Sequence, residues 1–399
     1  MVEQALIDRV AELEALELML LFRSLPKVHL TGSDLYLDVC DRLAALTDHG
    51  DLTAEEIVSI VAAAEPDTPK HILRNMLVNH LRAYVGRVDL SAADALAVLR
   101  ALAMLDPSSD PREEEQLRDL AGRVVRQLLE GLGTLTASQI GEAAHYLSLL
   151  GALEVEFPTR ESAELTRALV DAFCAQLHGV DAGAVASMIE SVSAADPAFV
   201  VRVGDTIRDN HDQFAPDEHA TVLEGVVGTA NLAVAGRMPA GREAAIDLLK
   251  DVLEVHETIV TNTAFDPDAR TYLRSVEALA MVDSRLRQRS PQQFNAAARR
   301  VLASLAANAR SLSASECVRA LSAAASLGTA ATDAVLDSLL RWLLEAGQCL
   351  APGDVGPILR AAQALPPLPT TRSRTRMTHE VLPKLLDRAD GGSGRAADP

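Results

Sequence analysis

Aromatic and lysine residues are scarce in this chain of 399 residues. Aromatic side chains make up 3% of it, Trp342 is the single tryptophan, and lysine occurs four times against 33 arginines. The hydrophobic fraction of 48% excludes a disordered chain and is dominated by Leu and Ala. A core of Leu, Ala and Val suits closely stacked helices, because small side chains let helix backbones approach each other.

Long apolar runs and strand patterns are also missing. No stretch reaches 18 uncharged apolar residues, and the best candidate, 15–22, is interrupted by Glu17. No run alternates β-branched and aromatic residues, so no sheet is expected. The sequence therefore predicts an all-α protein with no membrane partner.

Sequence motifs for common chemistry do not occur. The strings GxxxxGK[ST], GxGxxG, GxSxG and HExxH are absent. None of the ten histidines pairs with another four residues away. His211 and His219 flank Asp212, Asp217 and Glu218, a cluster that we interpret as a polar loop before a capped helix. We predict no enzyme, and no catalytic residue, metal, cofactor or small-molecule substrate.

Cysteine is too rare for a disulfide framework. The four cysteines are scattered inside or beside helical patterns, which indicates buried thiols and a reducing compartment. They are Cys40, Cys174, Cys317 and Cys349.

Positive charge is scarce overall but concentrated in one region. The net charge of −19 opposes general nucleic-acid binding, whereas 284–342 holds eight arginines and three acids and leaves −24 for the remainder. Clustered guanidinium groups can grip phosphates in pairs, or they can face solvent or pair with acids of adjacent repeats. No aromatic residue interleaves them for base stacking. The candidate RNA- or partner-binding residues are Arg285, Arg287, Arg289, Arg299 and Arg300.

A recurring phrase marks helix starts along the chain. In its strong copies a Leu precedes a Ser or Thr, which is followed three residues later by Glu, Asp or Gln. This pattern is a capping box, and the Leu can pack with an apolar residue of the first turn, as Leu52 with Ile57. Strong copies begin at Leu52, Leu90, Leu135 and Leu312, and looser copies at Val180, Phe214, Phe265 and Leu350.

The spacing of the phrase is that of a helix–turn–helix pair. Consecutive copies lie between 34 and 51 residues apart, and such pairs must stack to bury their apolar stripes. In the third unit we expect helices over about 137–150 and 161–177. The predicted fold is a right-handed α-solenoid of about eight repeats, similar in type to armadillo and HEAT arrays.

The expected domain organisation follows from these repeats. An N-terminal helical cap is expected over 1–48, the solenoid over 49–388, and a disordered tail over 389–399. The segment 233–242 contains two glycines and a proline and is a candidate hinge.

The phrase L-[ST]-A-x-[DE], with an Ala- and Leu-rich first helix as in 98–103, resembles degenerate repeats of organellar RNA-metabolism factors. These include the octotricopeptide and FAST-kinase/RAP-type proteins, and solenoids of kinetoplastid mitochondrial RNA-editing and ribosome-assembly complexes. The resemblance covers roughly 30–388 and implies a mitochondrial α-solenoid in RNA processing or translation. The chain departs from the pattern in its acidic balance and in lacking a basic, aromatic C-terminal module.

These observations predict a non-catalytic scaffold or adaptor that binds protein partners in a multi-subunit mitochondrial complex for RNA editing or mRNA maturation. The alternative is a repeat protein that binds single-stranded RNA directly through the patch from Arg285 to Arg300. Mitochondrial localisation is implied by the resemblance alone, because the acids Glu3, Asp8 and Glu12 are unlike a presequence. The cytoplasm is the alternative location.

Overall fold

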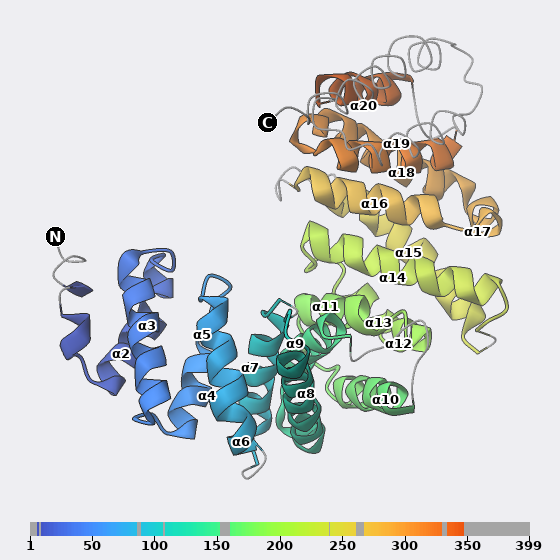
Figure 1. Cartoon of the computed structure of the whole chain (residues 1–399). Helices are drawn as coiled ribbons and strands as arrows, with labels where there is room; N and C mark the ends of the chain where they lie inside the picture. The colour runs from blue at the N-terminus through green and yellow to red at the C-terminus, as the bar shows by residue number, and fades with distance from the viewer. Residues whose placement is uncertain are drawn as a thin grey trace. The chain divides into compact units, whose positions relative to one another are not determined.

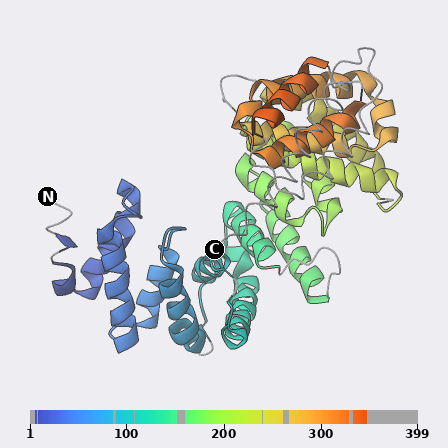
Figure 2. The same ribbon diagram turned by 45° about the horizontal axis from the view of Figure 1, so that its top comes forward.

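The structure is a computed structural model made of helices. It describes residues 6–7, 9–85, 89–106, 108–151, 160–238, 240–260, 267–328 and 333–346, and within these ranges it contains no β-strand. The chain divides into two compact units, unit 1 over Met1–Gly179 and unit 2 over Val180–Pro399. Figures 1 and 2 show the packed helices of each unit from two directions. The expected all-α repeat fold is confirmed.

Unit 1 consists of helix pairs in two layers. First helices of consecutive pairs contact each other and form what we call the A-layer; the second helices form the B-layer. The A-layer contains α2 (Ala15–Ser24), α4 (Ala54–Ala62), α7 (Ala92–Ala103) and α9 (Ala137–Leu149). The B-layer contains α3 (Asp34–His49), the run α5 (Lys70–Asn75), η3 (Met76–Leu81) and α6 (Arg82–Val85), then α8 (Pro111–Gly131) and α10 (Arg160–Cys174). The cap expected over 1–48 is thus itself a helix pair, α2 and α3.

Unit 2 repeats the same plan. Its A-layer contains α11 (Ala182–Val192), α14 (Pro216–Val234), α16 (Ala269–Met281) and α19 (Ala314–Leu327). Its B-layer contains α12 (Pro197–Arg202), α13 (Gly204–Asp209), α15 (Arg242–Val260), α18 (Pro291–Ala307) and α20 (Asp333–Ala346). The short α17 (Ser284–Arg289) connects α16 to α18. Within unit 2 each A-layer helix contacts the next one (Figure 1).

The predicted capping boxes are present at three A-layer helices. Thr53 accepts a hydrogen bond from the Glu56 N–H at 3.3 Å, and the Glu56 carboxylate accepts one from the Thr53 N–H at 2.7 Å. The same reciprocal pair forms between Thr136 and Gln139 and between Ser313 and Glu316. Each box satisfies two backbone donors that the helix leaves unpaired.

The copy at Leu90 forms half of this arrangement. The Asp94 N–H donates to Ser91 Oγ at 3.2 Å, but the Asp94 carboxylate accepts from the Ser91 hydroxyl at 2.6 Å. Aspartate is one methylene shorter than glutamate, so its carboxylate bonds the nearer hydroxyl. Among the looser copies, Asp181 and Asp268 cap α11 and α16 with their own carboxylates. Glu218 reaches back to the Ala215 N–H at the start of α14.

Side chains in or just after second helices also bind the backbone carbonyls of the phrase leucines. Gln176 Nε2 donates to the Leu135 carbonyl at 2.9 Å, and Trp342 Nε1 donates to the Leu312 carbonyl at 3.0 Å. The 3₁₀ turns η4 (Leu132–Thr134) and η5 (Ala309–Ser311) come directly before these two leucines. The entry to the first helix is therefore tied to the second helix of the same pair.

Small side chains bring the helices of unit 2 close together. In α19 the buried residues include Ala314, Ala320, Ala323, Ala324 and Ala325. The buried aromatic side chains of unit 2 include Phe199, Phe214 and Phe294. None of the described helices has the length and apolar character needed to cross a membrane.

The boundary between the two units does not coincide with the candidate hinge predicted from the sequence. The boundary between the units lies at Gly179 and Val180, and Gly179 adopts a φ of +77° that favours glycine. The candidate hinge 233–242 lies within unit 2, where it joins the contacting helices α14 and α15. The expected repeat that begins at Leu350 and the expected tail 389–399 lie outside the described residues.

We expect the Thr136→Ala variant to be less stable than the wild type by about 1 kcal/mol, because it removes the N-cap acceptor of α9. The free energy of unfolding in urea, followed by circular dichroism, measures this. Ser148→Ala, at the exposed C-terminal end of α9, is the matched control and should change stability by less than about 0.5 kcal/mol. Equal losses in both variants would contradict the capping role of Thr136.

Candidate functional site

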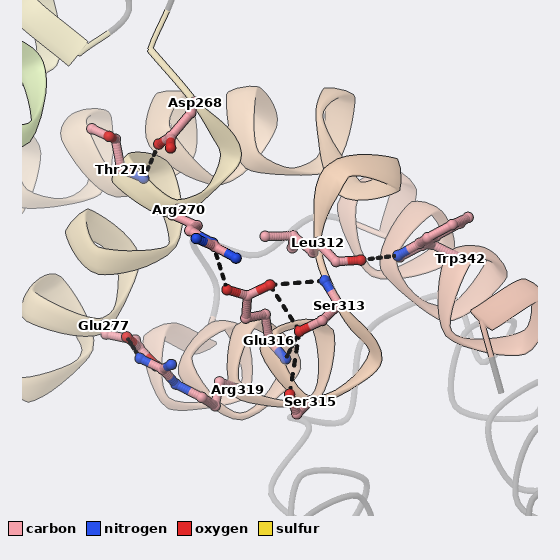
Figure 3. Close-up of polar contacts among 10 residues, drawn as sticks. All are labelled: Asp268, Arg270, Thr271, Glu277, Leu312, Ser313, Ser315, Glu316, Arg319 and Trp342. Atoms are coloured by element: carbon pink, nitrogen blue, oxygen red, sulfur yellow. Dashed lines mark hydrogen bonds and ion pairs between the residues drawn. The ribbon is translucent and has the colours of Figure 1, made fainter. Parts of the chain in front are cut away.

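Arginine–glutamate pairs join neighbouring A-layer helices of unit 2 in a fixed register. Glu224 and Glu277 each lie nine residues after the N-cap of their helix, Ala215 and Asp268. Their partners on the next helix lie six residues after its N-cap. Arg274 Nε is 2.9 Å from the Glu224 carboxylate, and the Arg319 guanidinium binds both oxygens of Glu277 at 2.7 and 2.6 Å (Figure 3). We call these contacts the nine-to-six ladder.

A related contact occurs in unit 1. Arg23 lies nine residues after Glu14, the N-cap of α2, and donates to Ser59, six residues after Thr53, the N-cap of α4. The register recurs because adjacent first helices begin at equivalent caps and pack side by side. The nine-to-six ladder therefore follows from the stacking of repeats and has a structural role.

Glu316 has two functions at one carboxylate. One oxygen accepts from the Ser313 N–H at 2.8 Å as part of the capping box, and the other lies 2.9 Å from Arg270 Nε on α16 (Figure 3). The backbone hydrogen bond from Ser313, followed by its hydroxyl and by the Arg270 charge, lowers the pKa of Glu316. The helix cap and the link between α16 and α19 thus share one side chain.

The five candidate arginines lie on α17 and α18, and Arg285, Arg287 and Arg289 each bind a different part of the chain. Arg285 binds Asp283 at 3.1 Å, and Arg289 lies 3.4 Å from Glu243 on α15. Arg299 and Arg300 lie on the exposed side of α18. Their binding of RNA or of a partner stays a prediction, because none of these contacts tests it.

Arg287 binds backbone carbonyls. Its guanidinium donates to the carbonyls of Val282 and Ala280 near the end of α16, at 2.8 and 2.6 Å, and to that of Ser326 near the end of α19, at 2.9 Å. It also lies 5.1 Å from the centre of the Phe294 ring. A cation at helix C-termini is stabilised by the negative end of the helix dipole. Arg287 therefore ties the ends of two A-layer helices together, a role that the local sequence did not indicate.

A groove of about 840 Å³ runs along α14 from Thr221 to Ala235. Helix α14 has 19 residues, whereas its A-layer neighbours α11 and α16 have 11 and 13, so its last turns extend beyond theirs. A side chain at Gly225 would lie 2.3 Å from Ile189 of α11, whereas nothing lies within 4 Å of one at Gly228. Gly225 thus permits close packing of the two helices, and Gly228 opens the floor of the groove.

Charged residues stand at both ends of this groove. At one end Arg274 lies between two carboxylates, 2.9 Å from Glu224 and 3.0 Å from Glu190 of α11. Burial lowers the pKa of the Arg274 guanidinium, but the hydrogen bonds and charges of Glu224 and Glu190 raise it above its usual value. At the other end lie Arg237, which is exposed, and Asp283. Sequence reasoning missed this groove, although two glycines three residues apart within a helix were a visible signal.

Asn231 fixes the wall of the groove at its far end. Its amide nitrogen donates to the Met281 carbonyl at 2.8 Å, and its oxygen accepts from the Asp283 N–H at 2.9 Å. Both hydrogen bonds hold the end of α16 against α14. The exposed side chain of Met281 is thereby placed at the groove.

Two histidines form a buried pair between α14 and α15. His219 Nδ1 and His256 Nδ1 lie 2.9 Å apart, and their rings are stacked at 5.1 Å. Burial lowers the pKa of His219 to about 4, and burial with the nearby His219 lowers that of His256 well below its usual value. His256 Nε2 is buried without a hydrogen-bond partner. An N–H there would be costly, so we assign the shared proton to His256 Nδ1, which donates to His219.

The two histidines of the cluster seen in the sequence have different hydrogen-bond partners. His211 Nδ1 donates to the Arg208 carbonyl at 2.7 Å. Within the described ranges, no three His, Cys, Asp or Glu side chains are placed to hold a metal ion. The true neighbour of His219 is His256, which lies 37 residues away on another helix and was not identified from the sequence.

The cysteines that the structure describes form no disulfide bond. Cys40 and Cys317 are buried, and burial raises the pKa of each thiol to about 12. The prediction of buried thiols is confirmed for these two, Cys174 is only partly buried, and Cys349 lies outside the described residues.

We expect stability to fall as the pH drops from about 6.5 to 4. Folded His219 and His256 have lowered pKa values, so the unfolded state binds more protons in this window and is favoured by acid. Each histidine contributes a slope of up to about 1.4 kcal/mol per pH unit. The free energy of unfolding against pH measures it, and His256→Leu should flatten the slope.

His71→Gln is the control, because it removes an exposed histidine of unit 1, away from the pair. It should leave the slope unchanged. A separate readout is the NMR titration of the His219 ring, which should stay neutral to about pH 4. Titration of that ring near 6.5 in the folded wild type would contradict the assignment.

No family model matches the sequence, and no curated protein matches it. Among solved structures the chain is similar to a "circular tandem repeat protein with novel repeat topology and enhanced subunit contact surfaces". The two share 14% sequence identity with a TM-score of 0.28, over 99% of this chain and 98% of the other. The helical-repeat fold is established by the helix packing described above, independently of this likeness.

Proposed function

We propose that this protein is a non-catalytic helical-repeat scaffold that binds protein partners. The open groove along α14 carries the proposal, because it is lined by apolar and charged side chains and lies on the face of three adjacent first helices. Such concave, partly apolar sites are typical of binding sites. Glu224 and Arg274, two of the charged side chains that line it, are paired between helices.

The cellular setting is also part of this proposal. The recurring phrase resembles repeats of octotricopeptide and FAST-kinase/RAP-type proteins, and we infer a place in a mitochondrial complex for RNA editing or mRNA maturation. The net charge of −19 supports partners that carry basic segments. Direct RNA binding is less well supported, since Arg285, Arg287 and Arg289 have partners within the chain.

We expect affinity purification of the tagged full chain from its native cell to recover protein partners that survive ribonuclease. Their association should weaken as salt is raised, because an acidic surface and basic segments attract through screened charges. An unrelated protein of similar negative charge with the same tag is the control for unspecific capture.

Two results would contradict the scaffold proposal. Recovery of no stable protein partner would remove its basis. Loss of every partner on ribonuclease treatment would instead favour the alternative, a repeat protein that holds RNA directly.

A further inference from the structure

We propose that the groove along α14 binds an extended peptide segment of a partner, with a basic side chain at one end and apolar side chains beside it. This inference rests on the proposed scaffold function and specifies the chemistry of the partner. Four features of the groove support it: its charge balance, its exposed apolar side chain, its dimensions and the charge at its far end.

The charge balance favours a cation at the end formed by α11, α14 and α16. Glu190 and Glu224 share the single guanidinium of Arg274, so this end carries one uncompensated negative charge. Both glutamate side chains are 45% exposed and can be reached from the groove. An incoming lysine or arginine would give each carboxylate its own cation through charge-assisted hydrogen bonds.

The apolar part of the groove lies next to this cation site. Met281 is 53% exposed, and it is the one large hydrophobic side chain exposed within the described part of unit 2. It lines the groove together with Leu232 and the open Gly228. An apolar side chain of the partner placed here would remove Met281 and Leu232 from water.

The length of the groove sets the length of the segment that it can hold. From Thr221 to Ala235 the floor follows α14 for about 21 Å at ~1.5 Å per residue. About six extended residues span the same length at ~3.3 Å each.

The far end of the groove favours a negative group. Asp283 there is already paired with Arg285 at 3.1 Å, whereas Arg237 is exposed at the end of α14. The segment should therefore carry its basic residue four or five positions from an acidic residue or a carboxyl terminus, with apolar residues between them.

The test uses a phage-displayed library of random 12-residue peptides selected against the immobilised full chain. We expect enriched sequences to contain a Lys or Arg, intervening apolar residues and an acid at that spacing. Synthetic copies with a fluorescent label then give affinities by anisotropy for the wild type and for four variants.

The first two variants test whether the peptides lie in the groove. Gly228→Leu fills the groove floor without changing charge and should weaken binding by at least about tenfold. Gly122→Leu, at an exposed glycine of α8 that also has nothing within 4 Å, should bind within about twofold of the wild type.

The other two variants test the cation site. Glu190→Gln with Glu224→Gln should weaken binding and reduce its dependence on salt. Asp209→Asn with Glu254→Gln removes the same charge from exposed positions of unit 2 outside the groove. This second pair should have little effect.

Several outcomes would overturn the inference. The first is a library without enrichment, and the second is enrichment of acidic peptides. The third is that the selected peptides bind the Gly228→Leu variant as tightly as the wild type. The fourth is that an oligonucleotide binds the wild type and no longer binds the Gly228→Leu variant. The scaffold proposal is tested separately, by the partners purified with that variant. If they are recovered as with the wild type, the groove assignment fails and the scaffold stands; if no partner is recovered with the wild type, the scaffold fails.

Discussion

The helix cap that begins each first helix sets the phase of everything packed against it. The side chain of a Ser, Thr or Asp accepts a hydrogen bond from a backbone N–H in the first turn of the helix, as Ser313 does from Glu316 in α19. Because equivalent residues start neighbouring helices, their side chains return at equivalent heights. Position nine of one helix then lies beside position six of the next, and Glu277 meets Arg319 across α16 and α19.

The same regularity shows where unit 2 departs from its own pattern. Helix α14 is longer than its neighbours and carries glycines where side chains would fill the space between helices. The ladder pair Glu224 and Arg274 gains a second carboxylate, Glu190. Length, small residues and an unbalanced charge therefore coincide at one place and produce a groove.

Local signals made much of the fold predictable. Caps depend on residues three positions apart, so Thr53, Thr136 and Ser313 were identified as helix starts from the sequence. Contacts between helices depend on packing and were not predicted. His219 binds His256, and Arg287 binds the Ser326 carbonyl, and each pair lies too far apart in the sequence for a local pattern to reveal it. The arginine cluster showed the same limit, since charge along the sequence does not reveal the partner of a guanidinium. The groove required knowing that α14 extends past α11 and α16.

The central claim is that cap-defined register pairs position nine with position six of adjacent first helices. A double-mutant cycle on Glu277 and Arg319 tests it most directly, with the free energy of unfolding measured for Glu277→Arg, Arg319→Glu and the double reversal. The account predicts that each single reversal destabilises and that the double variant recovers most of the loss, with a coupling of up to about 1 kcal/mol that shrinks in high salt. A double variant that loses the sum of the two single effects would contradict it.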